Sequence, residues 1–172
     1  MREKPAVGVV MGSDSDLEIM QRCVKQLQEL GVACEVRVIS AHRTPRTAHE
    51  YARTAARRGL RVIVAGAGMS AALAGVMAAS TTLPVIGVPI ESGSLKGLDA
   101  LLSTAQMPPG VPVACMSVGH AGATNAAVLA AEIIGLCDAK LARRLLRFKK
   151  EQARKVVRKD AEIQKKGVGR GA

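Results

Sequence analysis

The stretch VGVVMGSDSD (residues 7–16) changes abruptly from apolar to polar at Gly12. A short apolar run such as residues 7–11 is typical of a strand that is buried on both faces of a sheet. Beyond it, Ser15 and Glu18 stand at the spacing of a capping box at the start of a helix. Apolar residues then recur at helical spacing as far as Gly31, a suitable helix stop. The stretch therefore predicts a buried strand that leads directly into an amphipathic helix.

The same alternation repeats along the chain without an internal sequence repeat. Further strands are expected at residues 34–39, 60–64, 84–88 and 113–118. Further helices are expected at residues 44–58, where Thr44 caps and Pro45 begins the first turn, and at residues 69–80, 95–105 and 123–135. Such alternation is typical of a parallel sheet with helices on both faces, and right-handed crossovers restrict its topology. The sequence therefore predicts an α/β fold, a flavodoxin-like three-layer α/β/α sandwich with a five-stranded parallel sheet.

The chain divides into a nearly neutral body, residues 1–137, and a basic tail, residues 138–172. The tail holds 13 Lys and Arg against 4 Asp and Glu, and the body holds 12 against 10. One Tyr, one Phe and no Trp leave almost no stacking platforms, so the composition argues against a nucleic-acid partner. The tail is predicted to form one long C-terminal helix to residue 165 and to be disordered beyond Gly167. Its apolar stripe is sparse, and the first half of the helix is expected to pack on a neighbour, such as another subunit.

Length and composition suit a single domain, since 172 residues with 48% hydrophobic residues can bury a full core. No apolar run approaches the roughly 20 residues that span a bilayer, and residues 1–5 lack the apolar stretch and cleavage site expected of a signal peptide. The cysteines lie far apart, without metal-ligand spacing. We therefore expect a cytoplasmic protein with no membrane partner, no metal site and buried free thiols. The four cysteines are Cys23, Cys34, Cys115 and Cys137.

Three polar or glycine-rich loops follow the first three expected strands, at residues 12–16, 40–43 and 65–70. In open parallel sheets, ligands bind at the carboxyl ends of strands, near the point where the strand order reverses. We therefore expect the three loops to meet and to form the functional site.

The first loop offers the hydroxyls of Ser13 and Ser15 and the N–H groups of a helix N-terminus, which suit a phosphate. The alternative is that the serines only cap the helix while Asp14 and Asp16 complement its dipole. A second serine, where one cap suffices, favours the phosphate. No Gly-Lys-Ser/Thr follows, so the loop is not a Walker A motif, and residues 66–75 do not fit a Rossmann fingerprint.

The second loop places two functional side chains next to each other. Arg43 can pair with a phosphate or a carboxylate through its planar guanidinium, and His42 can change protonation near neutral pH. The alternative for His42 is a solvated loop residue, which Arg43 and the Ser/Asp-rich loop make less favoured. His49 is expected on a helix surface. His120 is expected to have a plain loop role, although it could approach the site.

The third loop offers backbone rather than side chains. Gly66, Ala67 and Gly68 allow a flat ring to approach main-chain groups, and they also suit tight helix–sheet packing. Together the three loops predict a site for a phosphorylated, nucleotide-like small molecule with one acid/base residue.

With GSDSD, SAHRTP (residues 40–45) and AGAG (residues 65–68) in place, the chain resembles a known family. These are the 5-(carboxyamino)imidazole ribonucleotide mutases of de novo purine synthesis, also called the class I catalytic subunit of phosphoribosylaminoimidazole carboxylase. The resemblance spans residues 6–137. It includes TLPVIGVPI (residues 82–90), GLDALLSTAQMPPGVPV (residues 97–113) and AGATNAAVLAAEI (residues 121–133).

The resemblance implies a flavodoxin-like subunit of a homo-octamer, with sites where subunits meet. It implies a carboxyl transfer from the exocyclic nitrogen to a ring carbon without metal, ATP or organic cofactor. Functional coupling to the ATP-dependent carboxyaminoimidazole ribonucleotide synthase is also expected. His42 matches the acid/base residue of the family. The expected substrate site comprises Ser13, Ser15, Asp16, Ser40, Arg43, Gly66, Ala67 and Gly68.

One segment departs from the family pattern. Bacterial mutases commonly read GGAAHLPG where this chain reads GMSAALAG (residues 68–75), so Ala72 occupies a histidine position and Ala74 a proline position. If that second histidine assists turnover, this chain is expected to be slower or to use another group, and His120 is one candidate.

Two alternatives to the mutase stay open. The first is a direct carboxylase that uses aminoimidazole ribonucleotide and CO2. That branch tends to carry Lys after the key His, so Arg43 favours the mutase. The second is a non-catalytic nucleotide- or flavin-binding module, against which the scarcity of aromatic side chains argues.

Overall fold

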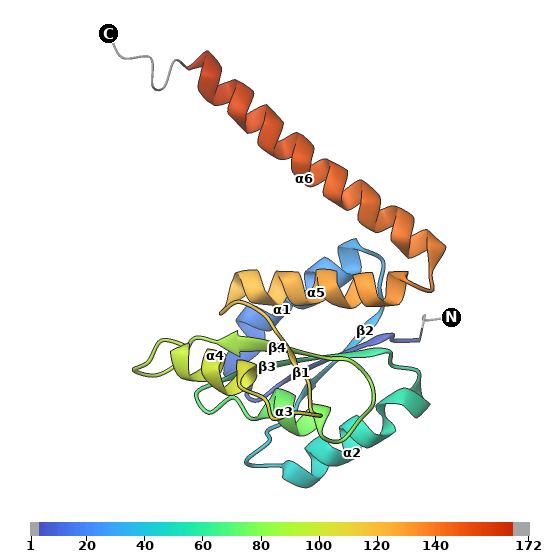
Figure 1. Ribbon diagram of the computed structural model, residues 1–172, viewed down its shortest axis with the longest axis vertical. Helices are drawn as coiled ribbons and strands as arrows, with labels where there is room; N and C mark the ends of the chain where they lie inside the picture. Colours follow the sequence, from blue (N-terminus) through green and yellow to red (C-terminus); the bar gives the residue numbers. More distant parts are fainter. Residues whose placement is uncertain (1–3, 167–172) are drawn as a thin grey trace.

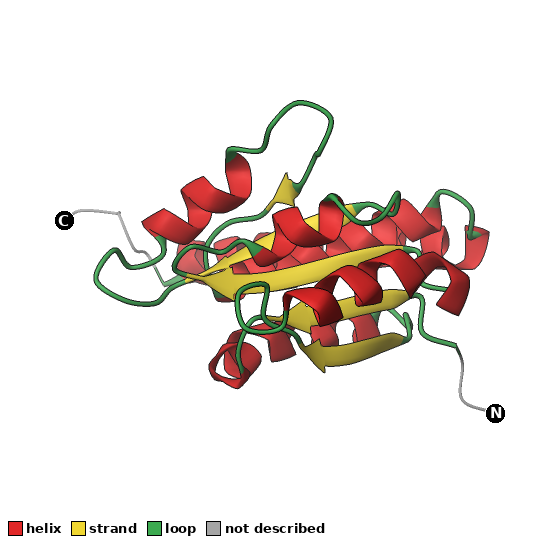
Figure 2. Cartoon of the chain, turned by 90° about the horizontal axis from the view of Figure 1, so that it is seen from below, coloured by secondary structure: helices red, strands yellow, loops and turns green. Residues whose placement is uncertain are grey.

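Strand β1 (Val7–Met11) lies inside a parallel five-stranded sheet whose strand order is β2-β1-β3-β4-β5. The computed structural model describes residues 4–166, and Figures 1 and 2 show helices on both sides of the sheet. The other strands are β2 (Cys34–Val38), β3 (Val62–Gly68), β4 (Val85–Ile90) and β5 (Ala114–Cys115). The helices are α1 (Leu17–Glu29), α2 (Pro45–Ala55), α3 (Leu73–Ala78), α4 (Leu98–Ala105), α5 (His120–Gly135) and α6 (Ala139–Lys165). This is the predicted flavodoxin-like sandwich.

The sheet has one apolar core on each face. Val7, Val9 and Met11 belong to the core that α1, α5 and the first turns of α6 cover. Val10 belongs to the opposite core, which α2 and α3 cover. Because successive side chains of a strand point to opposite faces, β1 contributes to both cores and is buried along its whole length. The prediction of a strand buried on both faces is confirmed.

The parallel register brings three strand ends to one edge of the sheet. Met11 at the end of β1 is in register with Val38 of β2 on one side and with Gly66 of β3 on the other. The chain crosses from β1 to β2 in one direction and then passes over β1 to reach β3. This is the point where the strand order reverses, and such points form ligand crevices.

Strand β3 is longer than predicted, because it continues to Gly68 instead of ending at residue 64. Ala65 pairs in register with Gly87 of β4, and Gly68 pairs with Ile90. Alanine and glycine have low intrinsic strand propensity, but pairing between two neighbours overrides it here. Residues 65–68 therefore belong to the sheet, and the loop begins only at Met69.

Helix α3 is shorter than predicted and begins at Leu73 instead of residue 69. Met69 has φ of 53° and Ala71 has φ of 34°, which are left-handed values that a right-handed helix cannot include. In the same way Lys96 (φ 49°) and Gly97 (φ 86°) delay the start of α4 to Leu98. Left-handed alanine, methionine and lysine residues carry no local sequence signal, so these helix starts were predicted too early.

The helix starts around the first two loops also differ from the sequence prediction. The capping box is formed by Ser13 and Asp16 at the 3-10 turn η1 (Asp14–Asp16), and not by Ser15 and Glu18. Thr44 makes no side-chain cap, because its Oγ1 donates to the Ser40 carbonyl at 2.9 Å. Pro45 is the first residue of α2, as predicted.

Two further differences concern β5 and α5, whereas the end of α2 agrees with the prediction. Strand β5 has only two residues, Ala114 and Cys115, and is therefore shorter than the predicted strand at residues 113–118. Helix α5 begins at His120, before the predicted residue 123. A second 3-10 turn, η2 (Ala56–Arg58), ends α2 at the left-handed Gly59.

Helix α6 is the predicted long basic helix, and Asp138 caps it by accepting from the N–H groups of Lys140 and Leu141. Leu141 and Leu145 are buried in the core of the domain, and Phe148 packs against the same core. From residue 149 to residue 166 every side chain is exposed, and Figure 1 shows this half of the helix projecting away from the domain. The predicted disorder after Gly167 lies outside the described residues.

The cysteines differ in burial. Burial raises the pKa of the Cys23 thiol to about 12, and Cys34 and Cys115 are half-buried. Cys137 is exposed at the corner between α5 and α6, so the prediction of four buried thiols is wrong for this residue.

Within residues 4–166, no helix is both long enough and apolar enough to cross a membrane.

Candidate functional site

A cavity of 510 Å³ opens at the carboxyl edge of the sheet, where β1, β2 and β3 end. The three predicted loops contribute to its lining. Eight predicted site residues line it: Ser13, Ser15, Asp16, Ser40, His42, Arg43, Ala67 and Gly68. The structure therefore brings together side chains from β1–α1, β2–α2 and β3–α3 connections, as the sheet topology requires.

The first loop is organised by its own polar groups. Ser13 Oγ accepts from the Ser15 N–H at 3.4 Å and donates to Asp14 Oδ1 at 3.1 Å. The loop leads through η1 into α1, so the positive end of the helix dipole lies behind the serines. Hydroxyls in front of a helix N-terminus form a surface that suits an anion such as a phosphate.

Asp16 is the buried centre of this loop, with only 7% of its surface exposed. Its Oδ2 accepts from the Ser13 N–H at 3.1 Å and its Oδ1 accepts from Ser15 Oγ at 3.5 Å. Burial raises the pKa of Asp16, and the two hydrogen bonds together with the nearby Arg43 charge offset this only in part. A carboxylate has about four lone-pair positions, so Asp16 can still accept from a ligand hydroxyl.

Arg43 connects the second loop to the first. Its Nη2 donates to the Gly12 carbonyl at 3.0 Å, and its Nε donates to Ser40 Oγ at 3.4 Å. The Arg43 N–H also donates to Ser40 Oγ, at 3.1 Å. These contacts fix the guanidinium plane beside the serine loop, and the remaining N–H groups of the fork are available to an anion.

His42 lines the cavity and is exposed to solvent. It lies next to Arg43, so an imidazole and an anion-binding guanidinium share the same wall. His49 lies on the surface of α2, with its Nδ1 at 2.7 Å from Ser80 Oγ, as expected of a surface histidine.

The opposite wall is built from backbone and small side chains of residues 67–73. A Cβ atom at Gly68 would overlap Ser92 Oγ and lie 3.1 Å from the Ile90 carbonyl, so only glycine fits between β3 and the end of β4. Met69 and Ala71 then turn the chain with left-handed backbone angles. A flat ring can approach this wall closely, since few side-chain atoms project from it.

Two predicted site residues do not line the cavity. Gly66 faces the core, because a Cβ atom there would lie 2.9 Å from Met20 Cγ. Its carbonyl instead accepts from the Gly12 N–H at 3.0 Å and ties β3 to the first loop. His120 is the first residue of α5 and is absent from the cavity lining of its own chain.

Sequence reasoning missed several lining residues. Ser92 follows β4, and its Oγ is buried without a hydrogen-bond partner among residues 4–166. The polar segment Glu91–Ser94 after a predicted strand was the signal that could have identified it. The lining residues outside the three predicted loops are Ala71, Ala72, Leu73 and Ser92, whereas Gly12, Ala41, Met69 and Ser70 lie within those loops but were not named as site residues. Most carry no functional group, so composition could not point to them.

The fold and the cavity together define a class: a flavodoxin-like domain with a small-molecule site at the reversal point of its sheet. One wall offers hydroxyls, a carboxylate, a guanidinium and an imidazole, and the other offers backbone. Comparison with known proteins narrows the class. The family model described as AIR carboxylase matches residues 6–155, and the chain belongs to this family.

Individual relatives agree with that assignment. The chain is 50% identical over 165 residues to the N5-carboxyaminoimidazole ribonucleotide mutase of Pyrococcus horikoshii, covering 96% of this chain and 92% of the relative. It is 56% identical over 142 residues to the protein of the same name from Bacillus subtilis, covering 83% and 88%. The crystal structure of Treponema denticola PurE matches with a TM-score of 0.82 at 28% identity, covering 92% of this chain and 98% of that one.

Proposed function

We propose that this chain is an isomerase of purine (IMP) biosynthesis. It converts 5-(carboxyamino)imidazole ribonucleotide to 4-carboxy-5-aminoimidazole ribonucleotide. The observation that carries the proposal is the single cavity that joins His42 and Arg43 to the serine loop. The family match and the relatives named as mutases support the same reaction.

The phosphate of the substrate binds between the first two loops in this proposal. Ser13 and Ser15 donate hydroxyl hydrogen bonds, and Arg43 donates from its guanidinium fork. Asp16 accepts from a hydroxyl of the ribose, since ionised carboxylates only accept hydrogen bonds. Ser40 holds Arg43 in place through its Oγ.

His42 moves the proton. The imidazolium protonates the exocyclic nitrogen as the N–C bond of the carbamate breaks, which releases CO2 and leaves the free amine. The ring carbon then attacks CO2, and the neutral imidazole removes the proton from that carbon. The histidine ends in the state in which it began, so the isomerisation needs no net acid or base.

The backbone wall retains CO2 beside the ring between the two steps. Ala67 and Gly68 line the cavity, and Gly66 supports them from the sheet. Holding both reactants at contact distance replaces a bimolecular step by an effectively unimolecular one. His120 remains an auxiliary candidate, and in this proposal it acts only where another subunit brings it to a cavity.

Assembly follows from the division of the chain. Residues 1–137 form the catalytic domain, and Leu141 and Leu145 at the start of the tail stay in the core of the same chain. The projecting part, residues 149–166, packs on a neighbouring subunit of a cytoplasmic homo-octamer that couples to the ATP-dependent synthase. Exposed apolar side chains of the projecting helix, Val156 and Val157 at 67% and 68% exposure, support this packing. Deleting residues 151–172 is expected to reduce the number of subunits per particle, as measured by light scattering. An unchanged number of subunits would contradict the packing role.

The function is tested by giving the purified protein the carbamate substrate without ATP and following the carbon-carboxylated product. Stoichiometric conversion is expected. A second assay supplies 5-aminoimidazole ribonucleotide with bicarbonate. Efficient conversion in the second assay and none in the first would identify a direct carboxylase instead, and failure in both would leave a binding module.

A further inference from the structure

A second cavity, of 490 Å³, lies between the edge strand β2 and helix α2, away from the cavity that contains His42. Three arginines line it: Arg37 from β2, Arg46 from the first turn of α2, and Arg58 from η2. Lining residues of the two cavities do not overlap. The proposed reaction uses none of these arginines.

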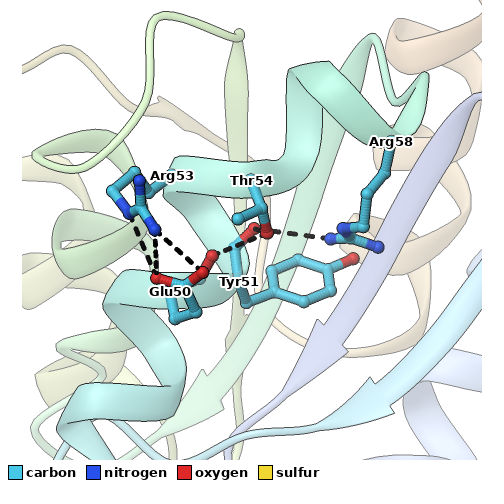
Figure 3. A network of polar contacts seen from close by, with 5 residues as sticks. All are labelled: Glu50, Tyr51, Arg53, Thr54 and Arg58. Carbon is cyan, nitrogen blue, oxygen red and sulfur yellow. Dashed lines mark hydrogen bonds and ion pairs between the residues drawn. The ribbon is translucent and has the colours of Figure 1, made fainter.

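One carboxylate, Glu50, is itself part of the cavity lining, and it is already paired. Glu50 accepts from Arg53 through both carboxylate oxygens, at 2.7 and 3.0 Å, as Figure 3 shows. Glu35 forms an ion pair with Arg58. Within residues 4–166, Arg37 and Arg46 form no ion pair with a carboxylate, so two positive charges of the cavity are uncompensated.

Arg58 and Tyr51 both line the cavity and pack against each other. The Arg58 guanidinium lies 4.5 Å from the centre of the Tyr51 ring, and its Nη2 donates to the Tyr51 carbonyl at 3.4 Å. Figure 3 shows the guanidinium beside the ring. Tyr51 is only 5% exposed, so its ring offers no face for a base to stack on. Recognition in this cavity therefore depends on charge and hydrogen bonding.

The hydrogen-bond donors that line the cavity indicate which class of ligand it can bind. Thr47 lines the same cavity and carries a hydroxyl, and two guanidinium forks stand on different elements. Planar forks match the oxygens of a phosphate, and hydrogen bonds between charged groups are about twice as strong as neutral ones. We propose that this cavity is a binding site for a small phosphate-bearing anion, held by Arg37, Arg46 and Thr47.

The position of the two arginines links the site to the catalytic loop. Arg37 precedes and Arg46 follows the segment of residues 39–44, which contains His42. An anion held by both arginines would connect the end of β2 to the first turn of α2. We therefore expect bound phosphate to slow backbone opening of the connecting segment.

The test separates this cavity from the catalytic one, which also suits a phosphate. A variant with Arg43→Met and Ser13→Ala is titrated calorimetrically with inorganic phosphate, and separately with ribose 5-phosphate. Binding of one phosphate per chain is expected to remain. Adding Arg37→Met and Arg46→Met should weaken it by about tenfold or more, since the charged hydrogen bonds to the phosphate are lost. Tighter binding of ribose 5-phosphate would identify a metabolite ester as the ligand class, and equal binding would identify free phosphate.

The matched control replaces two exposed arginines elsewhere, Arg22→Met and Arg61→Met, with the same change in net charge. This control should change phosphate affinity less than about twofold, because only distant charges are removed. Hydrogen exchange of peptides that cover residues 37–46 should slow with phosphate in the Arg43→Met, Ser13→Ala background. If the Arg43→Met, Ser13→Ala variant does not bind phosphate, the proposed site is overturned. It is also overturned if the control substitutions weaken phosphate binding as much as Arg37→Met and Arg46→Met do. Either result leaves the mutase proposal intact, because wild-type turnover is measured without added phosphate.

Discussion

The two walls of the catalytic cavity are stabilised in different ways. The polar wall, residues 12–16 and 40–43, is held by hydrogen bonds between near neighbours, such as Ser13 N–H to Asp16 Oδ2 at 3.1 Å. The backbone wall, residues 67–73, is held by strand pairing, a close approach at Gly68 and left-handed turns at Met69 and Ala71. The sequence indicated that the polar wall contains a capping box but assigned it to Ser15 and Glu18 instead of Ser13 and Asp16. A close approach between distant strands leaves no such local pattern in the sequence.

This contrast assigns a separate task to each wall. The polar wall carries the groups that bind and transfer a proton, and the backbone wall determines the shape of the cavity. Substitutions in the polar wall should therefore change kinetic constants with little effect on folding. Substitutions in the backbone wall should change stability first.

The largest expected effect is that of His42→Asn in the polar wall. Asparagine keeps the size and polarity but cannot move a proton, so kcat should fall by about 10²–10⁴-fold while KM changes little. Steady-state kinetics on the carbamate substrate measure both constants. Since His42 is exposed, the unfolding midpoint in urea should match that of the wild type. Retained turnover would mean that another group transfers the proton.

Arg43→Met should have the next largest effect. Loss of a charged fork to the substrate phosphate removes about 1.5–3 kcal/mol, so kcat/KM should fall by about 10–100-fold, mainly through KM. Arg43→Lys is the matched control, since it keeps the charge without the fork and should recover only part of the loss. Full recovery by lysine would show that charge alone suffices. The hydrogen bonds that orient the Arg43 guanidinium would then contribute little to substrate binding.

Met69→Gly tests the backbone wall. Left-handed angles destabilise a residue other than glycine by roughly 1–2 kcal/mol, and glycine's larger entropy in the unfolded chain offsets about half of this gain. The side chain is 61% exposed, so little packing is lost. The free energy of unfolding in urea should therefore rise by about 0.5 kcal/mol. Met69→Ala keeps the Cβ atom and should leave stability unchanged. Equal stabilisation by alanine would locate the effect in the side chain.

The smallest expected effect concerns Asp16→Asn. Burial raises the pKa of Asp16, so the folded state binds this proton more tightly than the unfolded state does. Wild-type stability should then fall as pH rises from the ordinary carboxyl range through the raised pKa. Asparagine never ionises; its Oδ1 can accept from the Ser13 N–H, and its Nδ2 can donate to the Ser15 hydroxyl. Urea unfolding should show the variant slightly more stable than the wild type at neutral pH and equal to it below the ordinary carboxyl pKa. A difference that persists in acid would contradict this account.

The sequence predicted well where short-range patterns determine structure. The apolar run of β1, the periodicity of α1 and Pro45 at the start of α2 are all local signals. The prediction that three loops meet needed only the rule for parallel sheets, and the register of Met11 with Val38 and Gly66 confirms it.

Two errors were local, since the capping box and the Thr44 cap were both assigned wrongly. The larger errors arose where distant residues decide the conformation. Pairing with β4 extends β3 to Gly68, and the left-handed turns that follow delay α3. Ser92 reaches the cavity only because β4 lies beside β3. Whether Gly66 faces the cavity or the core depends on a single-residue alternation along β3, which a Gly-Ala-Gly sequence does not reveal.

The exposed thiol at the corner between α5 and α6 has a practical consequence for experiments. Burial suppresses ionisation of Cys23, Cys34 and Cys115, so a maleimide dye should react fastest at Cys137 without any engineered cysteine. A fluorophore at that corner would sit where the projecting helix leaves the domain. Its anisotropy would report in real time whether subunits dock there, in the unmodified sequence and at nanomolar dilution.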